Sequence, residues 1–123
     1  MKMLVLRAKW FYIGRTKGGL MLVTRWQASV IPTEDQLKMI LINEGLFPQK
    51  EEYPPQIEIE THRHAFDEVR IIISGEIFYN VSGNKLVLRA GDRIEIPSNT
   101  KHSMWIENNA PSASFYAKRP FKI

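Results

Sequence analysis

The chain has 123 residues, of which 44% are hydrophobic and 11% aromatic, and this is enough for the core of one domain but too little for two. It contains no cysteine, so a disulfide framework and a thiolate metal site are both excluded, and any metal would be bound by imidazole and carboxylate groups. The formal net charge is +4, but residues 1–33 hold six basic and no acidic side chains, whereas the remaining residues hold 11 basic and 13 acidic ones. The positive charge belongs to the N-terminal segment, and we therefore do not expect a nucleic-acid partner.

No apolar stretch approaches the roughly 20 residues that a membrane-spanning helix needs. The apolar N-terminal segment is interrupted by Arg7 and Lys9. We therefore expect neither a membrane helix nor a secretory signal, and together with the lack of cysteine this favours a cytoplasmic location.

The first thirty residues alternate apolar and basic side chains around Gly14 and the pair Gly18-Gly19. This pattern predicts two short strands joined by a turn, which we expect at the edge of a sheet. Three alternatives stay open for this segment: contact with a membrane surface, contact with RNA, or a dispensable extension if translation begins at Met21.

Residues 31–46 change to helical spacing. Thr33 and Gln36 have the spacing of a capping box, and Gly45 suits the position just after a helix. The apolar residues at helical intervals are Leu37, Ile40 and Leu41. One short amphipathic helix is expected here, and residues 47–56, with three prolines, predict an extended connection after it.

From residue 57 onward, runs rich in β-branched and aromatic residues alternate with turn residues. Seven strands are predicted, over residues 57–62, 69–74, 77–81, 85–89, 93–96, 103–107 and 113–118. With the N-terminal strands added, such short and regularly spaced strands predict an all-β fold, a jelly-roll barrel with one short N-terminal helix.

Three histidines and one glutamate form the candidate site. His62 and His64 are two residues apart at the end of a strand, and side chains at that spacing point to the same face. Glu68 follows as the next strand begins, whereas His102 lies far along the chain and can join the group only if the sheet folds over. Imidazole and carboxylate ligands with open positions suit one divalent metal ion, namely iron, manganese, nickel or cobalt, with zinc as a further option.

A lone His-x-His pair is common on strand surfaces, but here the spacing continues. His62-x-His64 is followed after three residues by Glu68 and after six more by Gly75, and Gly91 is followed after five residues by Pro97 and after four more by His102. Over about residues 56–107 this resembles the two signature motifs of the cupin superfamily, whose fold is the double-stranded β-helix, or jelly-roll barrel.

Three positions depart from the family motifs. Gln56 and Asn99 replace glycines, and Ile106 replaces an asparagine. Asn99 is the mildest change, because asparagine tolerates the left-handed backbone that a glycine would adopt. The four ligand positions are all filled.

The resemblance implies a metal held near the open mouth of the barrel by His62, His64, Glu68 and His102, with a small-molecule substrate entering beside it. We expect a single domain overall, in which residues 1–30 are N-terminal strands or an extension of the barrel and residues 31–123 are the cupin domain. Since small barrels of this kind usually pair, and the N-terminal strands offer unpaired edges, a homodimer is also expected.

The reaction is less defined than the metal site, because cupins host many chemistries. The run of residues 67–70, Asp-Glu-Val-Arg, is similar to the acireductone dioxygenases, which act on an enediol with iron or nickel. The expected function is a dioxygenase-like oxidoreductase that acts on a small oxygen-bearing substrate chelated at the metal. The alternatives are a non-catalytic small-molecule binder or sensor, and a metal-dependent isomerase.

Arg70 is the candidate catalytic residue. If Glu68 points inward, strand alternation places Arg70 and Ile72 on the same face, and a guanidinium would then stand near the metal. It would clamp an anionic substrate or hold a ligand carboxylate in place. The alternative is an arginine that extends to solvent at the rim.

Strand alternation raises one difficulty beside the site. A regular strand over residues 57–62 would place Glu58 and Glu60 on the same face as His62, and a bulge near Thr61 would resolve this. On the later strand Met104 and Ile106 share the face of His102, so we expect them to line the pocket.

Overall fold

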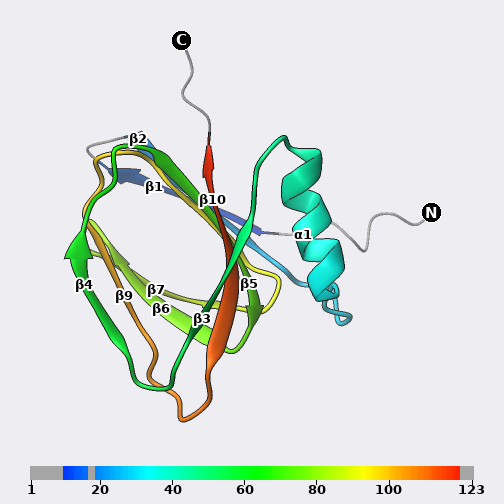
Figure 1. Ribbon diagram of the computed structural model, residues 1–123. Coiled ribbons are helices and arrows are strands. Elements are labelled where there is room, and N and C mark those ends of the chain that lie inside the picture. Colours follow the sequence, from blue (N-terminus) through cyan, green and yellow to red (C-terminus); the bar gives the residue numbers. More distant parts are fainter. Residues whose placement is uncertain (1–9, 17–18, 120–123) are drawn as a thin grey trace.

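Short strands make up most of residues 10–16 and 19–119, which the computed structural model describes (Figure 1). The strands are β1 Trp10–Thr16, β2 Gly19–Arg25, β3 Gln49–Tyr53, β4 Glu58–His62, β5 Asp67–Ser74, β6 Glu76–Val81, β7 Asn84–Arg89, β8 Arg93–Ile96, β9 His102–Trp105 and β10 Ser112–Arg119. The helix is α1, Glu34–Asn43. The seven strands predicted after residue 56 are all present, and their ends differ from the predicted ones by at most two residues.

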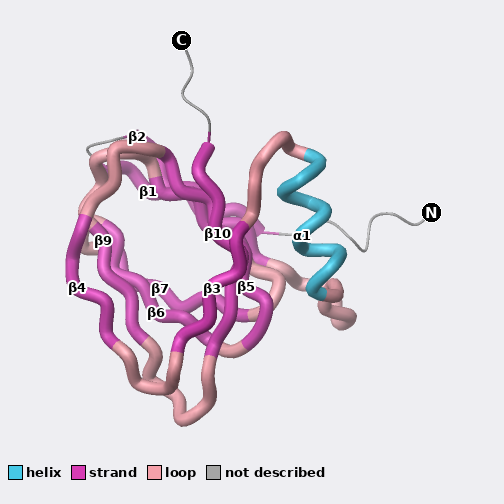
Figure 2. The backbone as a smooth tube through the Cα atoms, viewed as in Figure 1, coloured by secondary structure: helices cyan, strands magenta, loops and turns pink. Residues whose placement is uncertain are grey.

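The strands form two sheets that enclose a common interior. One sheet has the order β1-β2-β8-β5-β10-β3 and the other the order β4-β9-β6-β7, and the paired strands are antiparallel. Figure 2 views this arrangement from one end, with the strands surrounding the interior and the helix outside it. The predicted class, a jelly-roll barrel with one helix, is confirmed.

The interior is filled by apolar side chains from both sheets, as the alternation of each strand predicts. From the six-stranded sheet come Met21, Val23, Ile72, Ile94 and Ile96, and from the four-stranded sheet Ile77, Tyr79, Val81, Leu88 and Met104. Met104 and Ile106 both belong to this buried cluster, which confirms that they face inward as strand alternation predicts, while their place in the lining of a pocket beside His102 stays a prediction. This core fixes the faces of the strands that carry the candidate ligands.

Helix α1 packs on the outer face of the six-stranded sheet. The capping box is present: the Gln36 amide donates to Thr33 Oγ1, and the Thr33 amide donates to Gln36 Oε1. Leu37 and Leu41 are buried against the sheet in a second apolar cluster. Ile40 is 37% exposed, so its expected place on the buried stripe is wrong, because the helix is covered on one narrow face only.

The extended connection predicted for residues 47–56 contains a strand. Residues Gln49–Tyr53 pair with β10 and form the edge strand β3. Proline cannot donate to a ladder, but Pro48 and Pro54 lie just outside the paired residues. The prolines therefore limit the length of the strand without preventing it.

The predicted N-terminal hairpin is present as β1 and β2, with β1 at the edge of the six-stranded sheet. Its expected turn at residues 17–18 lies outside the described residues. Met21 and Val23 on β2 are fully buried in the interior, and β2 pairs with β8. Among the described residues, no helix has the length and apolar character needed to cross a membrane.

Candidate metal centre

Two imidazoles lie together where β4 ends. His62 is the last residue of β4 and His64 follows two residues later, and both are partly buried. Their ring centroids are 4.7 Å apart. The i, i+2 spacing thus places both rings on one side of the chain, as the sequence predicts.

His102 reaches the pair through strand pairing. It begins β9, which lies beside β4, and His62 and His102 are direct partners across the two strands. The His102 ring centroid is 4.3 Å from that of His62 and 5.2 Å from that of His64. The three histidines thus meet without the sheet folding over, because β4 and β9 are neighbours in the same sheet, and the expected folding over is needed only to bring Glu68 to them.

The three imidazoles form a group suited to a metal ion. One potential ligand nitrogen from each ring lies within 4.8 Å of the other two. Nδ1 of His62 lies 2.8 Å from the Glu60 carbonyl oxygen, and Nδ1 of His102 lies 2.9 Å from the Thr100 carbonyl oxygen. A carbonyl oxygen only accepts, so Nδ1 carries a proton in both rings, and when the rings are neutral Nε2 keeps the lone pair that a metal requires.

Glu68 comes from the opposite sheet, at the start of β5, and closing of the barrel is what brings it to the histidines. Its Oε1 lies 3.3 Å from His64 Nε2 and 3.5 Å from His102 Nε2, and the side chain is 2% exposed. Burial acts to raise the pKa of Glu68, but contacts with His102 and His64 and the charge of Arg70 lower it well below its usual range. The carboxylate is thus held in the ionised form that binds cations.

Arg70 fixes the orientation of Glu68. Its guanidinium is buried and donates to Glu68 Oε2 from Nε at 3.0 Å. Nη1 donates to Glu51 Oε1 at 2.6 Å, to the Tyr53 hydroxyl at 2.8 Å and to Ser114 Oγ at 2.9 Å. The predicted inward direction of Arg70 is confirmed, and an arginine extended to solvent at the rim is excluded.

The sequence reasoning missed the residues that support Arg70. Glu51 and Tyr53 lie on β3, which was expected to be a connection without strand pairing, and Ser114 comes from β10. Phe66 was also missed, and its ring stacks on His64 at 4.7 Å. Glu51 and Tyr53 are two residues apart between two prolines, and this spacing was the available signal, but it places both side chains on one face only if the segment is a strand paired with β10.

The loop before β9 holds His64 from the other side. The Asn99 amide donates to the His64 carbonyl oxygen at 2.7 Å, and the Asn99 side chain accepts from Arg63. Asn99 has φ +59°, which confirms its expected left-handed backbone, and Gln56 also has a positive φ of +62°. Both positions therefore keep the backbone that glycine would favour in the related motifs.

A bulge in β4 separates carboxylates from the imidazoles. Ile59 pairs with Met104 and His62 with His102, so two residues of β4, Glu60 and Thr61, face one residue of β9. The predicted bulge near Thr61 is thus confirmed. It leaves Glu60 exposed and lets Ile59 pack on the core while His62 still joins the other histidines.

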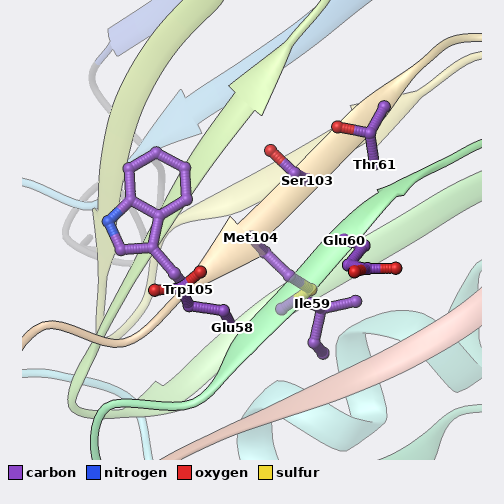
Figure 3. A pocket seen from close by; sticks show the side chains of 7 residues that line it. All are labelled: Glu58, Ile59, Glu60, Thr61, Ser103, Met104 and Trp105. Carbon is purple, nitrogen blue, oxygen red and sulfur yellow. The ribbon is translucent and has the colours of Figure 1, made fainter.

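A groove lies over this bulge on β4 and β9 (Figure 3). It is lined by Glu58, Ile59, Glu60, Thr61, Ser103, Met104 and Trp105. None of the three histidines lines it. The groove and the candidate metal centre are therefore two separate features of the β4–β9 pair.

Two buried atoms of the centre lack hydrogen-bond partners among the described residues: Glu68 Oε1 and His102 Nε2. An unpaired buried polar atom is costly. A divalent cation placed between them would satisfy both, and three imidazole nitrogens with one carboxylate oxygen are a ligand set that borderline transition metals accept. The residues present therefore fit a bound metal ion.

Solved structures share this fold. A cupin described as RmlC-like from Shewanella frigidimarina has a TM-score of 0.55 and 19% identity, covering 92% of this chain and 86% of its own. A predicted oxalate decarboxylase from Thermotoga maritima has a TM-score of 0.57 and 16% identity, covering 90% and 92%. A cupin protein from Bacteroides fragilis has a TM-score of 0.51 and 16% identity, covering 83% and 72%. At these identities the likeness shows the fold alone.

No curated protein matches the sequence. The family model described as Cupin domain matches residues 49–117, which is more than half of the 123 residues. This range includes β3 to β9 and most of β10, and thus all four candidate ligands. The chain therefore belongs to the cupin family.

Proposed function

We propose that this cupin is a metal-dependent enzyme that binds one divalent ion through His62, His64, Glu68 and His102. The substrate would be a small organic molecule that approaches the ion through two neighbouring oxygen atoms. A bound ion would act as a Lewis acid toward those oxygens, and iron would add redox chemistry with dioxygen, as in a dioxygenase. Isomerisation or decarboxylation would begin from the same arrangement.

One observation carries the proposal. In the barrel interior, Glu68 Oε1 and His102 Nε2 face each other at 3.5 Å, and neither atom has a hydrogen-bond partner among the described residues. Two buried acceptors in contact repel each other unless a proton or a cation lies between them. Since Nδ1 of His102 carries a proton toward a carbonyl, the neutral ring presents a lone pair at Nε2, and a divalent cation would bind both this nitrogen and Glu68.

Arg70 acts in this proposal as a positioning residue. Its guanidinium donates to Glu68, Glu51, Tyr53 and Ser114, so it has little capacity left for a substrate anion. Of the two roles considered from the sequence, holding a ligand carboxylate is the one that these contacts support. Nε and Nη2 of Arg70 both contact Glu68 Oε2, and charge-assisted contacts of this kind restrict the orientation of the carboxylate.

A second candidate function is a binder or sensor without catalysis. The buried carboxylates of the described residues are Glu68 and Asp92, and Asp92 accepts hydrogen bonds from Arg25, Trp26 and Arg89. No buried carboxylate is thus free to serve as a general base. A reaction that needs such a base is disfavoured, while metal-centred redox chemistry and plain binding are not.

The proposal is tested with purified protein in two steps. Elemental analysis should find about one equivalent of a divalent metal, and the His62→Ala and His102→Ala variants should lose it. Oxygen consumption is then followed with a panel of enediols, diols and hydroxy acids. Full metal occupancy in both variants would contradict the ligand assignment, and metal binding without turnover of any substrate would favour the binder.

A further inference from the structure

A third buried polar atom of the barrel interior also lacks a hydrogen-bond partner among the described residues: the hydroxyl of Tyr79. The other two, Glu68 Oε1 and His102 Nε2, are satisfied by the proposed metal ion. A metal bound between those two atoms leaves the Tyr79 hydroxyl unexplained. Since buried hydroxyls are nearly always paired, this group points to a further occupant of the interior.

The register of the four-stranded sheet places Tyr79 close to the metal centre. β6 lies beside β9, with Tyr79 opposite Met104 and Val81 opposite His102. Tyr79 and His102 are therefore diagonal neighbours on the same face of the sheet. Residues in that relation are typically about 7–8 Å apart, a distance that an aromatic side chain can span. Tyr79 is fully buried, so its ring lies in the interior and not at the surface.

The surroundings of Tyr79 suit a hydrogen-bond donor. Burial raises the pKa of Tyr79 well above its usual value, while the charge of Arg70 acts to lower it and that of Glu68 to raise it. The hydroxyl is therefore protonated at neutral pH and can donate. Ile72 and Met104 belong to the same buried cluster as Tyr79, so apolar side chains lie in this part of the interior beside the charged pair of Arg70 and Glu68.

We infer that Tyr79 is a substrate-contacting residue, whose hydroxyl donates a hydrogen bond to an oxygen atom of the small molecule bound at the histidine cluster. This inference rests on the proposed function and narrows its substrate class. The molecule has two neighbouring oxygens for the metal, at least one of which accepts a hydrogen bond, and a small apolar remainder that fits among aliphatic side chains. An extensively charged molecule is disfavoured, because the guanidinium of Arg70 is already taken by protein groups.

The test uses the full chain loaded with Co²⁺, and acetohydroxamate as a probe that chelates metals through two oxygens. Binding is followed by the visible spectrum of the cobalt and by calorimetry. Tyr79→Phe removes only the hydroxyl, and we expect it to keep the cobalt content of the unchanged protein but to bind the probe about tenfold more weakly, ~1.4 kcal/mol. The thermal midpoint of the metal-free variant should equal or exceed that of the unchanged protein, because an unpaired buried hydroxyl is removed.

Tyr116→Phe is the matched control. Tyr116 is only partly buried and its ring lies 4.9 Å from the Arg70 guanidinium, a contact that phenylalanine keeps. We expect probe affinity and thermal midpoint to stay within the error of the unchanged protein. If Tyr116→Phe lowers the affinity for the probe as much as Tyr79→Phe does, the assignment of the hydrogen bond to Tyr79 is overturned.

Failure of the inference and failure of the proposed function give different results. If the unchanged protein binds no cobalt, the metal centre itself is wrong and the inference fails with it. If cobalt binds but the affinity of Tyr79→Phe for the probe is within twofold of that of the unchanged protein, the metal centre stands and the role of Tyr79 is wrong. A lowered midpoint together with unchanged probe affinity would identify Tyr79 as a core residue whose hydroxyl is paired with buried water.

Discussion

Replacing Arg70 with methionine removes the cation that faces Glu68 and keeps a side chain of similar length. The Arg70 and Glu68 side chains are 5% and 2% exposed and 3.0 Å apart, so the variant leaves a carboxylate buried without its counter-charge. Removing one partner of a buried ion pair costs about 3–5 kcal/mol. The contact with Glu51, whose side chain is 39% exposed, adds little because solvent screens it. We expect Arg70→Met to lower the free energy of unfolding by about 3 kcal/mol or more.

The assay is urea unfolding of the metal-free protein, followed by circular dichroism, on Arg70→Met, Glu68→Gln and the double variant. The double variant removes the uncompensated carboxylate, so it should be more stable than Arg70→Met alone, and the two effects should not add. Metal affinity of Arg70→Met should also fall about 10–100-fold, as for other residues that orient a ligand. A loss below about 1 kcal/mol, or additive effects in the double variant, would refute the reasoning.

Three further predictions concern the histidines, a motif glycine and a surface ion pair. His102→Ala should lower metal content in elemental analysis while the far-ultraviolet circular dichroism stays β-rich, and a loss of the spectrum instead would make His102 a folding residue. Gly91→Ala should destabilise by about 2 kcal/mol in urea unfolding, since Gly91 has φ +89° and an added Cβ would lie 2.8 Å from Trp26. Glu44 accepts hydrogen bonds from Arg93, which lower its pKa in the folded protein, so its stabilisation is present above the usual pKa of about 4.3 and is lost as pH falls. Glu44→Gln should thus cost about 0.5–1 kcal/mol at pH 7 and progressively less below pH 4, and an equal cost at both pH values would contradict this origin.

Local signals in the sequence were sufficient for much of the fold. The capping box of Thr33 and Gln36 is a contact between residues three apart, and it appears as predicted. The bulge near Thr61 could be predicted because two glutamates on the His62 face would have buried unpaired charge. Both predictions depend only on residues close together in the chain and on the alternation of side chains along a strand, and this information can be read directly from the sequence.

Features that depend on distant pairing could not be predicted. The strand β3 has no hydrophobic alternation of its own and is defined by its ladder with β10. Without that ladder, the sequence did not place Glu51 and Tyr53 beside Arg70. Clamping a substrate anion and holding a ligand carboxylate therefore both stayed open as roles for the arginine. The neighbouring position of β4 and β9 was missed for the same reason, because antiparallel partners 40 residues apart leave no trace in local spacing.

The extra residue in β4 allows two inward side chains to be separated by an odd number of residues along the chain. Ile59 and His62 are three residues apart, so a regular strand would place them on opposite faces, and the bulge returns both to the interior. Deletion of either Glu60 or Thr61 would restore regular alternation with Ile59 and His62 still facing inward, opposite Met104 and His102. Deletion of both would make Ile59 and His62 adjacent in the chain, turn one of them to the opposite face and break up the histidine group.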